Sequence, residues 1–236
     1  MSRSLEPRLI IETSARLHLR VAERFPGSGL AKLAGDLEGI AREAEIRGSR
    51  IARPHAGLRG ASWLLTAALV AGVPYALSRM GFSFSSRAGF DFLQGVEAAA
   101  NLTLLFGAAI VSVWKFEESL RRRRALETVY ELKSLAHVID MHQLTKHPEP
   151  PSRLLPSTKS SPTRTLSGLE LARYLDYCGE MLSVVGKIAA LYAQNLQDPV
   201  VLDAVDGVED LTTGLSRKIW QKIAVLPDGP DPLSRA

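Results

Sequence analysis

The sequence is poor in cysteine: Cys178 is the only one among 236 residues. An intrachain disulfide is therefore impossible, which suits a reducing compartment. Cys178 falls on a regular apolar stripe, so we expect a small buried hydrophobe rather than a nucleophile. We also expect no cleavable signal peptide, because residues 1–60 carry charges throughout and hold no uninterrupted apolar stretch.

The short motifs that mark many enzymes are missing as well, including a glycine-rich phosphate loop, a G-x-S-x-G turn and a cysteine pair. His137 and Asp140 lie one turn apart on a predicted helix and are the candidates for a metal site, but His142 points elsewhere. Zinc-binding histidine pairs on helices are normally spaced four residues apart. We therefore expect a protein that is not an enzyme and that binds no cofactor or metal.

The net charge is only weakly positive, +4 from 29 lysine and arginine residues against 25 aspartate and glutamate residues. A basic soluble protein would suggest nucleic acid as a partner. Here the arginines gather beside the apolar segments, where positive charge sets the topology of membrane proteins. We therefore expect the lipid bilayer, and not nucleic acid, as the partner.

Two long apolar runs are present, at residues 61–78 and 96–114. The first carries no charge, and the second carries only Glu97, near its start. Each is long enough to cross a hydrocarbon core of about 30 Å, and Trp63 and Trp114 lie near their ends as interfacial aromatics do. Buried core helices of a soluble protein are the alternative, but neither run has a wide polar face. The runs therefore predict a transmembrane hairpin, with Pro74 kinking its first helix.

The flanks of the two runs predict the topology. The connection at residues 81–95 is short, weakly charged and rich in phenylalanine, whereas the outer flanks are strongly basic. Because positive flanks stay in the cytoplasm, we expect a multi-pass protein of the plasma (inner) membrane with both termini cytoplasmic. The basic run after the second span either contacts anionic headgroups at the membrane surface or only determines topology. That run consists of Arg121, Arg122, Arg123 and Arg124.

A narrow polar stripe follows one face of the second span. Its members are Glu97, Asn101, Ala108 and Ser112, which recur at steps of four and seven residues. A glutamate and an asparagine facing lipid would be costly, so this face should meet protein or water. Two interpretations stay open: the stripe lines the pore of an oligomer, or it packs within the hairpin while Glu97 reaches the interface.

The remaining sequence predicts amphipathic helices. Residues 7–25 place Ile10, Leu17 and Val21 on one face, and the helix of the second span continues to Leu144 as a stalk. Ser167 and Glu170 have the spacing of a capping box. The helix that follows repeats apolar positions at steps of four and three, the seam of a coiled coil or bundle. That seam comprises Leu171, Leu175, Cys178, Leu182, Val185, Ala189 and Tyr192.

A last helix starts at Asp198-Pro199, with aspartate as cap and proline at the first position. It pairs with the preceding helix as an antiparallel hairpin, which is too small to be a domain alone and should dock on the N-terminal helices or on another subunit. The expected fold class is all-α, a membrane protein with a two-helix transmembrane hairpin and a cytoplasmic helical bundle. Its expected segments are N-terminal helices at 1–56, the hairpin at 57–114, the stalk at 115–146, a flexible proline-rich linker at 147–166, the C-terminal hairpin at 167–226 and a disordered tail at 227–236.

This layout resembles the SLATT membrane domains. The exit of the second span, Trp114 to Glu118 (WKFEE), leads into a charged helix that continues with Arg124, Glu127 and Glu131. The resemblance covers residues 30–145. It implies a pore-forming effector of bacterial conflict systems that is controlled by nucleotide signals.

Two functions are therefore open. The chain is either a homo-oligomeric, channel-like membrane effector controlled through its cytoplasmic helices, or a membrane-anchored scaffold that recruits a cytoplasmic protein partner. The polar stripe favours the first, and the seam at residues 171–192 favours the second.

Overall fold

The structure is a computed structural model that describes residues 4–52, 56–79, 88–146, 159 and 166–226. Some side chains within these ranges are also outside the description, at 49–52, 56, 58, 73, 76–79 and 88–92. The described part of the chain is all-α, with six helices and no strand, as the sequence predicts. The predicted linker at 147–166 and tail at 227–236 lie almost entirely outside the described residues.

The chain divides into two compact units, residues 1–52 with 124–236 and residues 53–123. We call the first the bundle unit and the second the apolar unit. The longest helix, α4 (Ala88–Leu144, 57 residues), contributes its N-terminal part to the apolar unit and its C-terminal part to the bundle unit. The bundle unit thus combines the predicted N-terminal helices, the later part of the predicted stalk and the predicted C-terminal hairpin.

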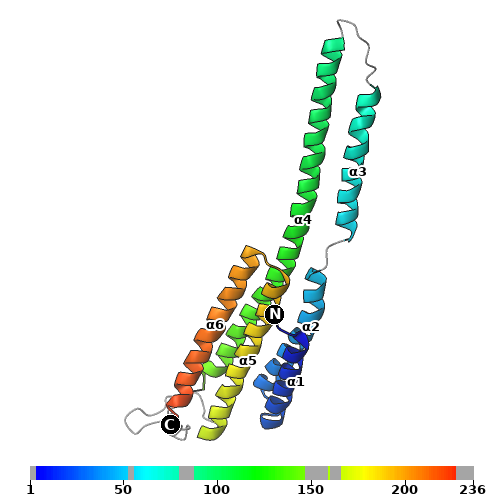
Figure 1. The fold of residues 1–236 in the computed structure, drawn as a ribbon. Helices are drawn as coiled ribbons and strands as arrows, with labels where there is room; N and C mark the ends of the chain where they lie inside the picture. The colour runs from blue at the N-terminus through cyan, green and yellow to red at the C-terminus, as the bar shows by residue number, and fades with distance from the viewer. Residues whose placement is uncertain (1–3, 53–55, 80–87, 147–158, 160–165, 227–236) are drawn as a thin grey trace. The chain divides into compact units, whose positions relative to one another are not determined.

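The bundle unit contains α1 (Pro7–Arg24), α2 (Gly29–Ala52), α5 (Gly168–Asn195), α6 (Pro199–Ala224) and the end of α4. Helix α5 lies between α6 and the α1–α2 pair (Figure 1), so it is covered on two sides. All residues of the predicted seam on α5 are buried, and so are Tyr174, Met181, Val184 and Ile188 beyond it. Of the two predicted docking sites for the C-terminal hairpin, the bundle unit uses the N-terminal helices.

Local signals set the helix ends of this unit. Ser167 and Glu170 form the predicted capping box, in which the Glu170 amide donates to Ser167 Oγ at 3.3 Å and the Ser167 amide donates to Glu170 Oε2 at 2.9 Å. The Asp198 carboxylate accepts from the Val200 amide at 2.9 Å at the start of α6, with Pro199 next. Both caps satisfy amides that have no partner within the helix. Gly27 takes φ +68° in the α1–α2 turn, where a side chain would be strained.

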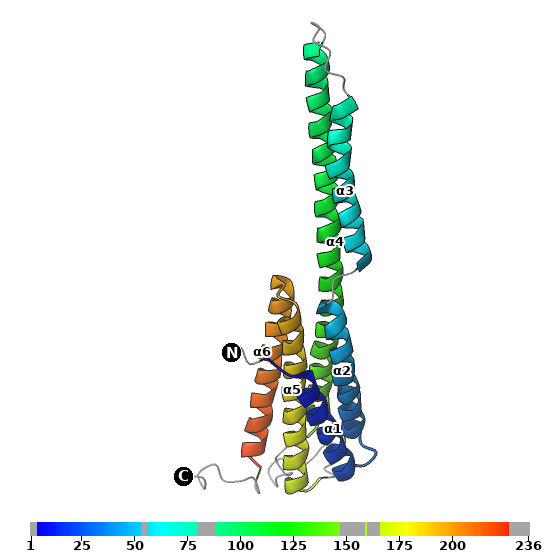
Figure 2. The same ribbon diagram turned by 45° about the vertical axis from the view of Figure 1, so that its right-hand side comes forward.

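The apolar unit contains α3 (Ala56–Arg79) and α4 up to Arg123. The two helices run side by side in opposite directions in both views (Figures 1 and 2). Helix α3 begins five residues before the predicted span at 61, and Pro74 lies inside it.

One boundary was predicted wrongly. Residues 88–95 were expected to belong to the loop, but they form the first turns of α4. No proline occurs between residues 75 and 147, so the helix can extend backward from the second span. Gly89 and Gly95 each oppose helix by about 1 kcal/mol relative to alanine, which a helix of this length tolerates. Phe82 and Phe84 of the predicted loop lie outside the described residues.

Candidate membrane-embedded surface

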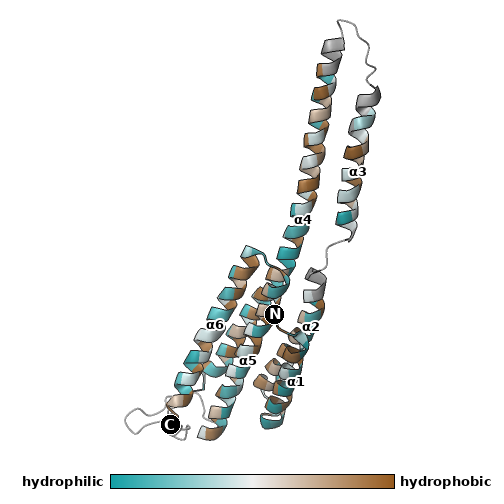
Figure 3. Cartoon of the chain, in the orientation of Figure 1, coloured by the Kyte–Doolittle hydropathy of each residue, from teal (hydrophilic) through white to brown (hydrophobic). Residues whose placement is uncertain are grey.

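Apolar side chains have opposite placements in the two units. Every buried hydrophobic side chain among the described residues belongs to the bundle unit, and none lies between Ala44 and Ala125. In the apolar unit, large side chains such as Leu64 (74% exposed) and Leu104 (71% exposed) point outward. Figure 3 shows the apolar colouring along this part of α4. An exposed apolar surface of this extent marks contact with a membrane or another protein.

One helix in the described part of the chain is long and apolar enough to cross a membrane. It is α4, over Leu93–Leu144, whose most apolar window has a mean hydropathy of 1.7 with none of its residues buried. A core helix of this chain would instead be covered by the chain's own residues. Several side chains of α3 lie outside the description, and the span predicted at residues 61–78 stays a prediction.

A hydrogen bond joins α3 to α4. The Trp114 indole Nε1 donates to Ser62 Oγ at 3.0 Å, and Ser62 is the one buried polar residue described in the apolar unit. Charged residues of both helices lie on one side of this bond, Arg59 just before Ser62 on α3 and Lys115 just after Trp114 on α4. The apolar segments of both helices lie on its other side. At 1.5 Å per residue, α3 continues for about 26 Å beyond Ser62, and α4 extends about 32 Å back from Trp114 to Leu93. Charged and apolar sequence therefore meet at one level on both helices.

The polar stripe of α4 lies on its free side. Glu97, Asn101, Ala108 and Ser112 are all exposed. On the opposite side of the helix, at 100° per residue, Gly95 is buried and Ala99, Phe106 and Ile110 are partly buried. This opposite side is the one that faces α3. Packing within the hairpin, one of the two interpretations of the stripe, therefore does not account for its position.

Hydroxyl groups on this helix are satisfied locally. Ser112 Oγ donates to the Ala108 carbonyl at 2.8 Å, and Thr103 Oγ1 donates to the Ala99 carbonyl at 2.8 Å. Such bonds to the preceding turn lower the cost of a hydroxyl in an apolar environment. Glu97 and Asn101 are the strongly polar members of the stripe and carry most of the cost of facing lipid.

The predicted basic run follows the apolar segment of α4. Arg123 and Arg124 are exposed, whereas Arg121 and Arg122 are partly buried. Arg122 pairs with Glu118 one turn earlier at 3.9 Å. The run therefore places positive charge after the apolar segment of α4, and its contact with a membrane surface stays a prediction.

The metal-site candidates are not brought together. His137 is exposed, and the Asp140 carboxylate accepts a hydrogen bond from Gln143 Nε2. No group of three or more metal-ligating side chains occurs among the described residues. Cys178 is fully buried, as predicted, and burial raises the pKa of its thiol to about 12.

Two polar clusters of the bundle unit were not predicted. Lys222 of α6 donates to the Gln143 carbonyl of α4 at 2.9 Å and to the Gln143 side chain, and burial lowers the pKa of Lys222. Arg47 of α2 pairs with Glu43 and donates to Glu131 Oε2 of α4 at 3.2 Å. Both join residues that lie 79 or more positions apart, so no local sequence signal could have found them.

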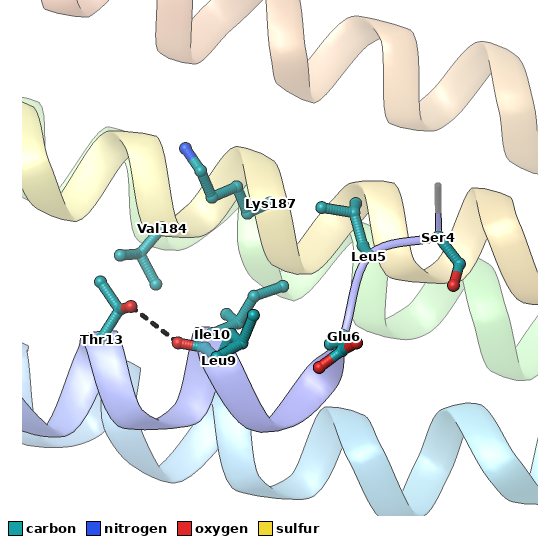
Figure 4. A pocket seen from close by; sticks show the side chains of 8 residues that line it. All are labelled: Ser4, Leu5, Glu6, Leu9, Ile10, Thr13, Val184 and Lys187. Atoms are coloured by element: carbon teal, nitrogen blue, oxygen red, sulfur yellow. Dashed lines mark hydrogen bonds between the residues drawn. The ribbon is translucent and has the colours of Figure 1, made fainter. Parts of the chain in front are cut away.

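A groove of about 580 Å³ lies where the N-terminal segment passes α1 and α5 (Figure 4). Leu5, Leu9, Ile10 and Val184 supply its apolar lining, and Lys187 lies at its edge. Gln194 holds the segment by accepting from the Leu5 amide at 2.8 Å and donating to the Leu5 carbonyl at 3.5 Å. The groove belongs to the bundle unit, and none of the predicted site residues lines it.

Comparison of the chain with protein-family models, with curated proteins and with solved structures found no match.

Proposed function

We propose that the chain is an integral membrane protein whose α3 and α4 cross the bilayer as a hairpin and whose copies associate through the polar stripe of α4. The observation that carries the proposal is the position of this stripe. It is exposed, it faces away from α3, and it lies among large exposed side chains that are apolar, such as Leu102, Leu104 and Leu105. In lipid, Glu97 and Asn101 would be satisfied by further protein or by water.

The connectivity supports two crossings rather than one. The residues before the apolar unit and those after it belong to the same compact unit. A segment that leaves and re-enters one unit crosses a bilayer an even number of times. The common level of charged residues at Ser62 and Trp114 supports the same reading. Since the basic flanks are on this side, the bundle unit and both termini would be cytoplasmic.

Stripes from several copies would enclose a polar path. Rings of carboxylate or amide side chains are one of the ways in which membrane proteins line a conducting path. The bundle unit would then control the assembly, because α4 belongs to both units. The resemblance of residues 30–145 to SLATT domains favours the same activity, a pore-forming effector of the bacterial inner membrane.

The alternative, a membrane-anchored scaffold without transport, loses the observation that motivated it. The seam at residues 171–192 is buried inside the bundle unit, so it offers no surface to a partner. A scaffold would have to recruit its partner through another face. We therefore prefer the oligomeric assembly.

The first test is the oligomeric mass of the full chain in detergent, measured by light scattering. An assembly of four or more copies supports the proposal, and a monomer or dimer has too few helices to enclose a path. The second test is leakage from proteoliposomes. Asn101→Leu should change leakage at least severalfold, whereas Thr103→Val, which removes a polar group from another side of the same helix, should not. Absence of leakage at every protein concentration would remove the pore.

A further inference from the structure

A second groove of the bundle unit, of about 650 Å³, lies between α5 and α6. The two helices run side by side in opposite directions in both views (Figures 1 and 2). Gly186 of α5 and Thr212 of α6 meet on its floor, where a Cβ atom added at Gly186 would lie 3.3 Å from Thr212 Oγ1. Thr212 is 6% exposed, and its hydroxyl donates to the Glu209 carbonyl at 3.1 Å. The hydroxyl on the floor is thus occupied, so the walls decide what the groove binds.

The walls carry two cations that have no partner. Lys187 of α5 and Arg217 of α6 both line the groove and are exposed. Neither makes a hydrogen bond or ion pair with a described residue, whereas Arg20 and Arg42 of the same unit are paired with glutamates. Unpaired positive charge along a groove attracts an anionic ligand.

The pairing of the two helices sets the distance between these cations. Because Gly186 is level with Thr212, Lys187 is level with residue 211, which is six residues before Arg217. The rise of 1.5 Å per residue then separates the two cations by about 9 Å along the groove. Their long side chains can therefore approach one ligand from its two ends.

Three hydroxyl groups lie between the levels of the two cations. Thr213 and Ser216 of α6 line the groove, and so does Ser183 of α5, which is level with residue 215. None of these hydroxyls makes a hydrogen bond to a described residue. Since each can donate one hydrogen bond, they add three donors to those of the lysine and the arginine.

The two ends of the groove differ in character. Glu209, level with residue 189, lies beyond Lys187 at one end. Trp220, which is 62% exposed, lies beyond Arg217 at the other end. A carboxylate repels further negative charge, and an exposed indole offers a flat apolar face to a planar ring. The ends therefore orient a ligand that has one charged group and one ring.

We propose that this groove binds a small phosphate monoester that carries a planar aromatic group. The phosphate has about two negative charges and three strong acceptor oxygens, which match two cations and several hydroxyl donors. A carboxylate has two oxygens and one charge, so it satisfies fewer of these donors. The ring lies toward Trp220, away from Glu209. The site lies within the bundle unit and does not depend on the assembly proposed for α4.

Calorimetric titration of the full chain in detergent tests the site, with phenyl phosphate as the probe, a phosphate-free buffer and detergent alone as the blank. We expect saturable binding with a Kd below about 1 mM, and no saturation up to about 10 mM overturns the proposal. Inorganic phosphate lacks the ring, and benzoate lacks the second charge, so each should bind at least about tenfold more weakly. Equal affinity for benzoate would contradict a phosphate site.

Substitutions in the walls separate a built site from general attraction of anions. Lys187→Gln and Arg217→Gln should each weaken phenyl phosphate binding at least about tenfold, because each removes charge-assisted hydrogen bonds. Lys218→Gln is the matched control, since Lys218 is exposed beside Arg217 but does not line the groove. Equal weakening by Lys218→Gln and Arg217→Gln overturns the proposal.

Trp220→Leu tests the orientation of the ligand. It should weaken binding of phenyl phosphate and leave that of inorganic phosphate unchanged, and loss of both would contradict a ring at this end. The substituted side chains are all exposed, so circular dichroism should show an unchanged fold. Asn101→Leu should not alter the Kd, so this result is separate from that of the polar stripe.

Discussion

Leu132 and Leu104 lie on the same helix and have opposite environments. Leu132, in the bundle unit, is fully buried against other helices, whereas Leu104, in the apolar unit, is 71% exposed. The same contrast holds for the two units as a whole, since every buried hydrophobic side chain among the described residues belongs to the bundle unit. Hydrophobic side chains are stabilised by removal from water, whichever medium replaces it. The bundle unit supplies that medium itself, and the apolar unit needs one from outside.

The largest difference between the two units is expected when each of these two leucines is replaced by alanine. We expect Leu132→Ala to lower the free energy of unfolding of the bundle unit by about 2–5 kcal/mol, because it leaves a cavity in a packed core. Leu104→Ala should change it by less than about 0.5 kcal/mol. Urea unfolding of the full chain in detergent measures both, with Trp220 as the fluorescent reporter after Trp63→Phe and Trp114→Phe. Equal losses for the two variants would contradict the comparison.

A charged substitution among the exposed apolar side chains of α4 tests whether lipid or protein covers them. Leu104→Arg places a charge in the centre of the apolar segment, and we expect it to oppose membrane insertion by about 2.5–3.5 kcal/mol. Tyr130→Arg, at an exposed position of the same helix in the bundle unit, is the control and should have no effect. The fraction of protein that stays with membranes after alkaline extraction reports the difference. Unchanged extraction of Leu104→Arg would indicate that protein, and not lipid, covers this surface.

The hydrogen bond between Trp114 and Ser62 lies where the charged and the apolar sequence of α3 and α4 meet. Ser62→Ala removes its acceptor. We expect this change to lower the free energy of separating α3 from α4 by about 1 kcal/mol. Thermal unfolding in detergent, followed by the fluorescence of Trp114, should show a lower midpoint. Thr66→Val is the control, because Thr66 bonds only to the Ser62 carbonyl of its own helix among the described contacts. A larger loss for Thr66→Val would show that the register has another origin.

The smallest expected effect is a pH dependence confined to the bundle unit. Hydrogen bonds from Arg42 and then His18 lower the pKa of Glu38 below its ordinary value of 4.5. The ionised carboxylate therefore stabilises the fold above pH 4.5, and this contribution is lost as the pH falls through the lowered pKa. We expect a loss of less than about 1 kcal/mol on acidification, because the pairs are near the surface. Glu38→Gln should show a smaller loss than wild type or Glu12→Gln in unfolding experiments from pH 6 to pH 3.

The sequence predicted those features whose causes are local. The capping box at Ser167, the Asp198-Pro199 start and the inward positions of α1 and α5 follow from neighbours within a few residues, and the structure confirms them. The start of α4 at Ala88 was missed because loop and helix differ little in free energy where glycine is frequent.

Features that depend on distant partners could not be predicted. Periodicity identified one seam on α5, but its second buried side depends on α6 and the α1–α2 pair lying on opposite sides. The links from Lys222 to Gln143 and from Arg47 to Glu131 likewise need the packed fold. For the polar stripe, spacing placed Glu97 and Asn101 on one face, and only the position of α3 decided that this face is the free one.

The central place of α5 has a consequence for the order of synthesis. Helices α1 and α2 leave the ribosome early, but α5, against which both pack, follows only after the whole apolar unit and the residues up to Gly168. At roughly 5–20 residues per second, α1 and α2 are therefore synthesised seconds to tens of seconds before α5. The apolar unit is complete and free to reach a bilayer during this interval. The bundle closes last, so a nascent chain stopped before α5 would lack the helix against which α1 and α2 both pack, while the apolar segment of α4 is already exposed.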